Sequence, residues 1–192
     1  MKGPIVFDFD KTLTDRDTLI GFYKIVNENN LLFKIKKTIL IFFSVLYKIK
    51  IIGNDHLKKV GVALFLVGVQ KSIIEDKSRE YAKNIKLNNI YYEHFLNTPR
   101  ENRIIASASF EIYLKEIFPS DKIYGSQLSY ENGKIKGLEK NMFGREKMEK
   151  LLESGITKIN TVYTDSYSDL PIMEMAEKVF LIKNNRIKKI KI

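Results

Sequence analysis

Cysteine is absent from the chain of 192 residues, and histidine occurs only twice. Without cysteine there is no disulfide scaffold, no zinc or iron–sulfur site built on thiolates and no cysteine nucleophile. Two histidines leave little for imidazole catalysis or for a metal site built on histidine. Carboxylates, hydroxyls and amines must therefore carry any chemistry that the protein performs.

The composition is that of a folded domain with an excess of positive charge. Hydrophobic residues make up 44% of the chain, which is enough to bury a core and to exclude a disordered or fibrous protein. The length suits one substantial domain, or one domain with an insertion. The formal net charge of +10 favours an anionic partner such as phosphate, a nucleic acid or a lipid surface, and does not distinguish among them.

Long hydrophobic runs are also missing. The longest uninterrupted apolar stretch, residues 38–47, is about half of the ~20 residues that a membrane-spanning helix needs. The first residues lack the cationic start, the apolar stretch and the small-residue cleavage site of a secretory signal. These absences predict a cytoplasmic protein that does not cross a bilayer.

Three short segments predict parallel strands. Residues 4–9, 103–106 and 160–163 each run from an apolar core into polar residues, and helical patterns follow the second and the third. Strands that end in polar loops entering helices are typical of an open α/β sheet, which binds ligands at the carboxyl ends of its strands. We therefore predict an α/β fold with a Rossmann-like parallel sheet at its core.

The stretch between the first two predicted strands has the pattern of amphipathic helices, without the alternation of strands. It predicts an all-helical cap subdomain at residues 16–97, inserted into a core made of residues 1–15 and 98–192. Residues 16–97 hold 14 Lys and Arg against 7 Asp and Glu, so most of the basic excess lies in the insertion. Residues 126–136 are expected to form a β-hairpin with Asn132-Gly133 at its turn.

Asp8 and Asp10 stand at the end of the first predicted strand. On an extended segment, side chains two residues apart point to the same side, so the two carboxylates meet there. Such a pair requires a cation, a shared proton or solvent exposure. Magnesium is suitable because it binds carboxylate and carbonyl oxygens and engages substrate phosphate. The alternative is that one aspartate only caps the following helix.

Four further residues occupy positions suited to phosphate chemistry. Ser107 could bind a phosphate oxygen through its hydroxyl and nearby N–H groups, and Lys147 could direct its ammonium at a phosphate and a carboxylate. Asp165 follows the third predicted strand, where a further metal carboxylate belongs, and Asp169 could orient Lys147 and metal-bound water. Three of the four also have an ordinary explanation: Ser107 and Asp169 could cap helices, and Lys147 could be a solvated surface charge.

In their order along the chain, these residues resemble the haloacid dehalogenase superfamily of phosphohydrolases. The resemblance rests on DFDKTLT at residues 8–14, the strand-ending Ser107, Lys147 in GREKMEKL, and DSYSDLP at residues 165–171. The helical insertion is similar in length and character to the type-one cap of the phosphoserine-phosphatase-like branch. Lys11 and Thr164 depart from the commonest pattern, which has glycine at both positions, but neither removes a reacting group.

The resemblance implies a phosphatase that hydrolyses a phosphomonoester of a small phosphorylated metabolite through an aspartyl-phosphate intermediate. Asp8 would attack the phosphorus, and Asp10 would protonate the leaving alcohol and then activate water. A phosphotransferase that passes the phosphoryl group to a second alcohol is the alternative, because access to the intermediate decides between the two acceptors.

The same resemblance implies a metal and a phosphate site. Mg²⁺ would be held by the Asp8 carboxylate, the backbone carbonyl of Asp10 and the Asp165 carboxylate. Ser107 and Lys147 would bind the transferred phosphoryl group.

Supporting and specificity residues are also expected. Thr12 and Asp169 are expected to support the site. Arg16, which closely follows the nucleophile loop, is a candidate on the substrate side, although an ion pair with Asp15 or Asp17 explains it equally well.

Residues 31–52 leave two substrate classes open. They hold five lysines and no acidic residue beside Leu, Ile, Phe and Tyr, a composition expected of a helix at an anionic membrane surface. In that case the enzyme would resemble the lipid phosphatases of the phosphatidylglycerophosphatase type and would lie peripherally on the inner face of the membrane. The alternative is a cap helix whose apolar face packs on its neighbours.

A hypothesis of another class is a basic, non-enzymatic module that binds nucleic acid, in which the acidic loops hold a structural cation. Its lysines, however, are mixed with aliphatic residues rather than arranged in a recognisable DNA- or RNA-binding motif. The acidic cluster would also repel a phosphate backbone without a metal. We therefore expect no nucleic-acid partner.

Overall fold

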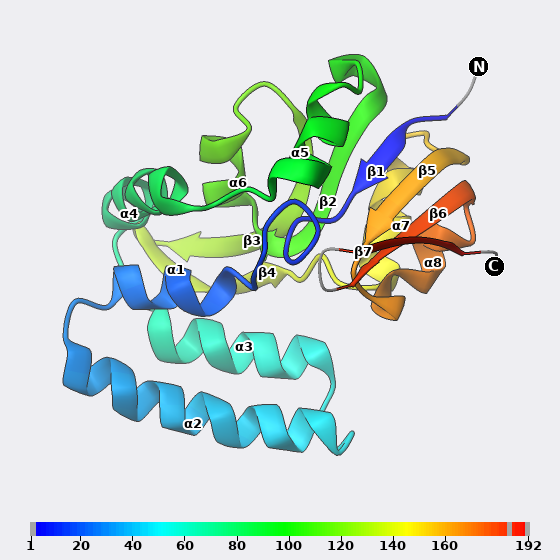
Figure 1. Ribbon diagram of the computed structural model, residues 1–192. Coiled ribbons are helices and arrows are strands. Elements are labelled where there is room, and N and C mark those ends of the chain that lie inside the picture. Colours follow the sequence, from blue (N-terminus) through cyan, green and yellow to red (C-terminus); the bar gives the residue numbers. More distant parts are fainter. Residues whose placement is uncertain (1–2, 184–185, 191–192) are drawn as a thin grey trace.

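The computed structural model describes residues 3–183 and 186–190, and within them the strands form one seven-stranded sheet of order β4-β3-β2-β1-β5-β6-β7 (Figure 1). Neighbouring strands from β3 to β6 pair in parallel, and β4 and β7 are antiparallel at the two edges. The strands are β1 (Ile5–Phe7), β2 (Arg103–Phe110), β3 (Lys122–Glu131), β4 (Lys134–Lys140), β5 (Ile159–Thr164), β6 (Ala176–Lys183) and β7 (Arg186–Ile190). The predicted α/β fold with a parallel sheet is confirmed.

Helices cover both faces of the sheet and form a further layer beside it (Figure 1). Among the described residues they are α1 (Leu19–Val26), α2 (Asn30–Lys48), α3 (Asn54–Phe65), α4 (Lys71–Asn84), α5 (Asn89–Leu96), α6 (Glu111–Ile117), α7 (Arg145–Glu153) and α8 (Leu170–Met173). Short 3₁₀ turns occupy Arg100–Asn102 and Tyr167–Asp169. Helices α5 and α6 pack on one face of the sheet and α7 and α8 on the other, while α1, α2 and α3 form the separate layer.

Two hydrophobic cores arise from the alternation of side chains along the central strands. Val6 and Ile104 join the core beneath α7 and α8, whereas the next residues, Phe7 and Ile105, join the core beneath α5 and α6. All four side chains are buried. A parallel sheet that is covered on both faces needs such continuous apolar runs, and this is the pattern that the sequence shows in these strands.

The three predicted strands are β1, β2 and β5, and they lie side by side at the centre of the sheet. The second is longer than expected: β2 continues beyond residue 106 to Phe110, with a shift of register between Ala106 and Phe110. Because the three strands are parallel, their carboxyl ends meet at one edge of the sheet. The polar residues that follow them are therefore brought together.

Helices are the regular elements of the predicted insertion, with isolated bridges at Gln70 and Leu87, but these helices do not all lie apart from the sheet. Helix α4 packs against α6. Helix α5 packs on the sheet, where the rings of Phe95 and Phe7 meet edge to face with centroids 5.2 Å apart. The separate layer is thus formed by α1, α2 and α3, and the division at residues 16–97 stays a prediction.

The expected hairpin is present as β3 and β4. Its turn has positive φ at both Asn132 (50°) and Gly133 (74°), which asparagine and glycine tolerate best. The free side of β4 pairs with the segment that follows α3. The N–H of Gly68 donates to the Ile135 carbonyl and the N–H of Ile135 donates to the Val69 carbonyl, each at 2.9 Å. The inserted helices are therefore joined to the sheet by main-chain hydrogen bonds.

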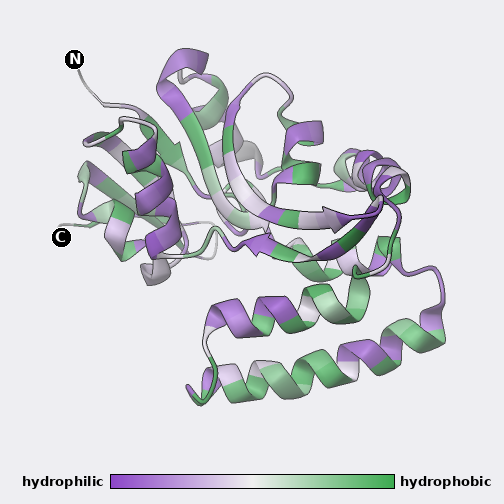
Figure 2. Ribbon diagram, turned by 180° about the vertical axis from the view of Figure 1, so that it is seen from behind, coloured by the Kyte–Doolittle hydropathy of each residue, from purple (hydrophilic) through white to green (hydrophobic). Residues whose placement is uncertain are grey.

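Across the described part of the chain, no helix combines the length and the hydropathy that a membrane span requires. The expectation that residues 31–52 do not cross a bilayer agrees with this finding. Most of that segment forms α2, the outermost helix of the separate layer (Figure 2).

One buried ion pair holds α5 against the sheet. The guanidinium of Arg103, at the start of β2, donates to Asp121 at 2.5 Å, and both side chains are only 7% exposed. The same guanidinium donates to the Phe95 carbonyl at 3.0 Å and the Thr98 carbonyl at 3.3 Å, at the end of α5. Removing the guanidinium would leave a buried carboxylate and two carbonyls without their donor.

We predict that Arg103→Met lowers the free energy of unfolding by about 3–5 kcal/mol, because it leaves Asp121 buried without its counter-charge. Urea unfolding followed by circular dichroism measures the change. The matched control is Lys59→Met, which breaks an exposed pair with Asp55 and should cost less than about 1 kcal/mol. Equal losses in the two variants would contradict this interpretation of Arg103.

Candidate active site

The carboxyl ends of β1, β2 and β5 border a cavity of about 470 Å³, and α1, α2 and α3 form its opposite wall. Five of the residues predicted to take part in the chemistry line it: Asp8, Asp10, Ser107, Lys147 and Asp165. The structure therefore brings together residues from four separate parts of the sequence.

Asp8 is fixed at the end of β1. Its N–H donates to the Tyr163 carbonyl of β5 at 2.9 Å, which continues the pairing of the two strands. Its carboxylate is 10% exposed, and Oδ1 lies 2.9 Å from Nζ of Lys147. Burial raises the pKa of Asp8 to about 7, against the opposing effect of Lys147 and with further contributions from Asp169 and Asp10.

Lys147 stands in the first turn of α7 and bridges two carboxylates. Its Nζ lies 2.9 Å from Asp8 and 2.8 Å from Asp169, and the Thr164 hydroxyl donates to Asp169 Oδ2 at 2.8 Å. Burial alone lowers the pKa of Lys147, but Asp169 and Asp8 outweigh burial and raise it above its ordinary value. The ammonium stays charged beside Asp8. Thr164 thus orients the Asp169 carboxylate.

Asp10 is held by three hydrogen bonds. Its Oδ1 accepts from the N–H of Thr18 at 2.9 Å and from the Thr18 hydroxyl at 2.7 Å, and its Oδ2 accepts from the Ser109 hydroxyl at 2.6 Å. Burial and the charge of Asp17 raise the pKa of Asp10 to about 6, although these hydrogen bonds oppose the shift. A carboxyl with this pKa exchanges its proton readily near neutral pH, as a general acid and base must.

The hydroxyl of Ser107 lies at the cavity and accepts a hydrogen bond from the N–H of Ser109 at 3.1 Å. Thr12 is fully buried, and its hydroxyl has no hydrogen-bond partner among the described residues. Thr14 instead shapes the loop after β1. Its hydroxyl accepts from the N–H of Lys11 at 3.2 Å and donates to the Arg16 carbonyl at 2.8 Å.

Asp165 follows β5 and lines the same cavity as Asp8. Burial raises the pKa of Asp165, and the nearby Lys11 lowers it. Within the described residues, no three acidic, histidine or cysteine side chains converge as a ready-made metal cluster. Carboxylates from Asp8 and Asp165 together with main-chain carbonyl oxygen are nevertheless the donors that Mg²⁺ prefers. Burial and, to a lesser extent, the charges of Asp169 and Asp10 raise the pKa of Asp8, and a nearby cation would oppose this shift. The donors present therefore fit a magnesium ion.

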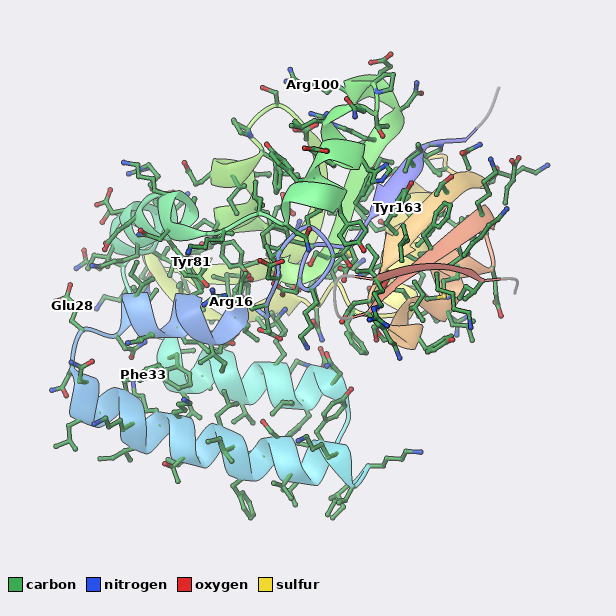
Figure 3. All side chains as sticks on the ribbon, viewed as in Figure 1. Arg16, Glu28, Phe33, Tyr81, Arg100 and Tyr163 are labelled. Atoms are coloured by element: carbon green, nitrogen blue, oxygen red, sulfur yellow. The ribbon has the colours of Figure 1, made fainter. Side chains whose placement is uncertain are left out.

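Arg16 is not brought to the site. Its side chain is exposed and does not line the cavity, and it lies beside the start of α1 (Figure 3). The cavity is lined instead by the next residue, Asp17, and by Lys58 of α3. The sequence predicts neither residue at the site, and it suggests Asp17 only as an ion-pair partner for Arg16.

Lys58 is a buried amine at the boundary between the helical layer and the sheet. It is 6% exposed, donates to the Ala108 carbonyl and to the Ser126 hydroxyl (2.8 Å), and lies 4.7 Å above the ring centroid of Phe110. Burial lowers the pKa of Lys58 to about 7, although Asp10 and Asp17 oppose this.

A sequence signal for Lys58 exists. It shares a helical face with the buried Val62 and Phe65, four and seven residues further on, so it is a charged residue at a core position. The sequence gives no comparable signal for Thr18 and Ser109. Their contacts with Asp10 depend on how the loop after β1 folds back against β2.

The sequence profile of the haloacid dehalogenase-like hydrolases matches residues 5–174. This span contains every residue of the site described above. The chain therefore belongs to this family of enzymes, as its motifs predicted, and the hypothesis of a non-enzymatic nucleic-acid-binding module is set aside.

Solved structures share the fold. A protein of unknown function from Bordetella pertussis Tohama I superposes with a TM-score of 0.73 at 13% identity, over 93% of this chain and 89% of that one. A phosphoserine phosphohydrolase-like protein from Francisella tularensis subsp. tularensis SCHU S4 superposes with a TM-score of 0.66 at 19% sequence identity, over 93% of this chain and 86% of that one. Phosphoserine phosphatase from T. onnurineus superposes with a TM-score of 0.61 at 19% sequence identity, over 93% of this chain and 82% of that one. No curated protein sequence matches the chain.

Lys58 makes a testable contribution to the pH dependence of stability. Its pKa is 10.5 in the unfolded chain and about 7 in the fold, so between these values the unfolded state binds one more proton. The free energy of unfolding therefore rises with pH, by about 1.4 kcal/mol per pH unit. We predict that the free energy of unfolding of Lys58→Met does not show this rise between about pH 7 and about pH 9.

Urea unfolding at successive pH values measures the slope. The exposed neighbour Lys59 provides the matched control, since Lys59→Met should keep the slope of the unsubstituted protein. If Lys58→Met also keeps the slope of the unsubstituted protein, the Lys58 amine is not buried in its neutral form.

Proposed function

We propose that the chain is a phosphatase that hydrolyses phosphomonoesters through an aspartyl-phosphate on Asp8. One observation carries the proposal: a buried carboxylate that contacts a charged lysine lies in the same cavity as a second carboxylate, Asp10, held by three hydrogen bonds. A nucleophile beside an ammonium, with a positioned acid and base, is what transfer of a phosphoryl group to a carboxylate needs. Membership of the hydrolase family supports the assignment.

Asp8 and Asp10 divide the chemistry between them. An oxygen of Asp8 attacks the phosphorus, the bond to the leaving alcohol breaks, and Asp10 gives its proton to the departing oxygen. Asp10 then takes a proton from the water that hydrolyses the aspartyl-phosphate. The bonds from Thr18 and Ser109 keep the Asp10 carboxyl in one orientation through both steps.

The phosphoryl group is bound by Lys147 and Ser107. The Lys147 ammonium supplies a fixed positive charge, which Asp169 and Thr164 hold in place. The Ser107 hydroxyl lies on the β2 side of the same cavity. These donors stabilise the negative charge that the phosphoryl oxygens carry during transfer.

Asp8, Asp165 and the backbone carbonyl of Asp10 would hold Mg²⁺. When bound, the ion neutralises charge on the transferred phosphoryl group and favours the ionised form of Asp8.

The proposed substrate is a small phosphorylated metabolite of the kind that phosphoserine phosphatases hydrolyse. The similarity to solved phosphoserine phosphatases supports this class, as does the cavity, which is about large enough for a small organic phosphate. On the side of the helical layer, the cavity is lined by one acid, Asp17, just before α1, and by Lys58 of α3, a buried amine whose pKa burial lowers to about 7.

A second candidate is a phosphatase of lipid-borne phosphomonoesters. The observation that favours it is the row of exposed apolar side chains on α2, the helix that also contributes Leu40, Ser44 and Tyr47 to the cavity. A phosphate-release screen that includes phosphoserine, sugar phosphates, nucleoside phosphates and phosphatidylglycerol phosphate decides between the two classes.

We predict that Asp8→Asn is folded and inactive. An amide cannot form the aspartyl-phosphate, so release of p-nitrophenol from p-nitrophenyl phosphate in the presence of Mg²⁺ should fall at least ~10³-fold. Circular dichroism checks the fold. The control is Asp76→Asn, an exposed aspartate of α4 that should retain full activity. Turnover by Asp8→Asn at the rate of the unsubstituted enzyme would end the assignment.

We further predict that the effect of Asp10→Asn depends on the leaving group. Release of an alkoxide needs a proton from Asp10, whereas p-nitrophenolate departs without one, so the first step should slow by ~10²–10⁴-fold only for an alkyl phosphate. Single-turnover assays with phosphoserine and p-nitrophenyl phosphate measure that step. Asparagine keeps an oxygen that can accept from Thr18, which limits damage to the loop. Equal losses on both substrates would exclude Asp10 as the general acid.

A further inference from the structure

Helix α2 has two apolar faces, of which only one packs on the protein. Phe33 and Leu40 are buried, and Phe33 points into the helical layer, where its ring centroid lies 5.4 Å from that of Phe65 (Figure 3). At about 100° per residue, the side of the helix opposite Phe33 and Leu40 faces away from α1 and α3. We call this side the outer face of α2.

The outer face of α2 is mostly apolar, with the exposed Thr38 between Ile35 and Phe42. Its apolar side chains recur at helical spacing. They are Leu31 (71% exposed), Ile35 (53%), Phe42 (60%) and Val45 (50%). Ile49, just beyond the helix, continues the row at 59%. Figure 2 shows α2 as the outermost helix, with hydrophobic residues along it. A soluble monomer rarely exposes so many large apolar side chains on one face of a helix without a partner for them.

Positive charge borders this face. Residues 29–54 contain five lysines and no acidic residue. Lys34, Lys37 and Lys48 are exposed, and in the described part of the chain none of the three pairs with a carboxylate. The acids that flank the segment, Glu28 and Asp55, already pair with Lys77 and Lys59. The surface that α2 presents is therefore apolar, and its lysines have no nearby carboxylate to balance their positive charge.

We propose that the outer face of α2 docks on an anionic lipid bilayer. The apolar row enters the boundary between head groups and acyl chains, and the bordering lysines contact the anionic head groups. The same charge disfavours a second copy of this chain as the occupant, because two facing α2 helices would bring their lysines together without acidic partners.

Docking in this way would hold the cavity close to the lipid surface. Leu40, Ser44 and Tyr47, on the inner side of α2, line the cavity, so only the thickness of one helix, about 10 Å, separates it from the docked face. The proposal concerns binding alone, so its failure would leave the proposed hydrolysis of soluble phosphomonoesters unaffected.

Sedimentation with vesicles tests the proposal on the full chain. We expect binding to vesicles of phosphatidylcholine with about one third phosphatidylglycerol, weaker binding to phosphatidylcholine alone, and loss of binding at high salt. Phe42→Gln should weaken binding roughly tenfold, since it removes a large apolar side chain from the row. Leu152→Gln, at an exposed leucine of α7 outside this face, should bind like the unsubstituted protein.

A second measurement uses the absence of tryptophan from the chain. Phe42→Trp keeps the face apolar and places one reporter in it, while Leu152→Trp places the reporter elsewhere. Anionic vesicles should shift the fluorescence of Phe42→Trp to the blue and leave that of Leu152→Trp unchanged. Neither residue lines the cavity, so both variants should keep their turnover of p-nitrophenyl phosphate.

The outcomes that overturn the proposal are distinct. Recovery of the protein in the supernatant with both kinds of vesicle would overturn it, as would binding that Phe42→Gln leaves intact. A stable dimer in sedimentation velocity that Phe42→Gln dissociates would assign the face to a second copy of the chain. A blue shift in Leu152→Trp equal to that in Phe42→Trp would show that vesicle binding does not select α2.

Discussion

The site depends on one ammonium group buried between two carboxylates. Lys147 joins Asp8, 139 positions before it in the sequence, to Asp169, 22 positions after it, and both contacts are shorter than 3 Å. Without this charge, two buried carboxylates would face each other and at least one would take up a proton. The position of α7 against β1 and the turn after β5 is therefore an electrostatic requirement as much as a matter of packing. Thr164 completes the arrangement by fixing the carboxylate that holds the lysine.

Those parts of the site that follow from regular structure could be predicted from the sequence. Asp8, Ser107 and Asp165 stand at the ends of apolar segments, and parallel pairing brings such ends together whatever the loops do. The contacts of Thr18 and Ser109 with Asp10 could not be predicted, because they depend on a loop in which Lys11 takes a positive φ of 56°. The same loop turns Arg16 outward and Asp17 toward the cavity. Two adjacent residues of opposite charge are thus separated, because Asp17 lines the cavity and Arg16 does not.

The inserted helices show a different limit of sequence analysis. Periodicity identified α2 as a helix, but the segment is apolar on opposite sides, and only packing decides which side is buried. Phe33 and Leu40 face the layer, whereas Phe42 and Val45 do not. Lys58 illustrates the converse case. Its position on the buried face of α3 can be inferred from spacing, but its partners on β2 and β3 follow only from the way the layer meets the sheet.

The two outer strands of the sheet, β4 and β7, affect whether a chain with the exposed apolar face of α2 aggregates. An uncovered outer strand invites pairing with strands of other molecules and so promotes aggregation. At one end of this sheet, the segment after α3 already occupies main-chain groups of β4. At the other end, β7 carries exposed basic side chains at Arg186, Lys188 and Lys189, which repel an incoming copy. With both outer strands protected, the chain can display apolar side chains on a helix, which offers no free main-chain groups, with little risk of growth into fibrous assemblies.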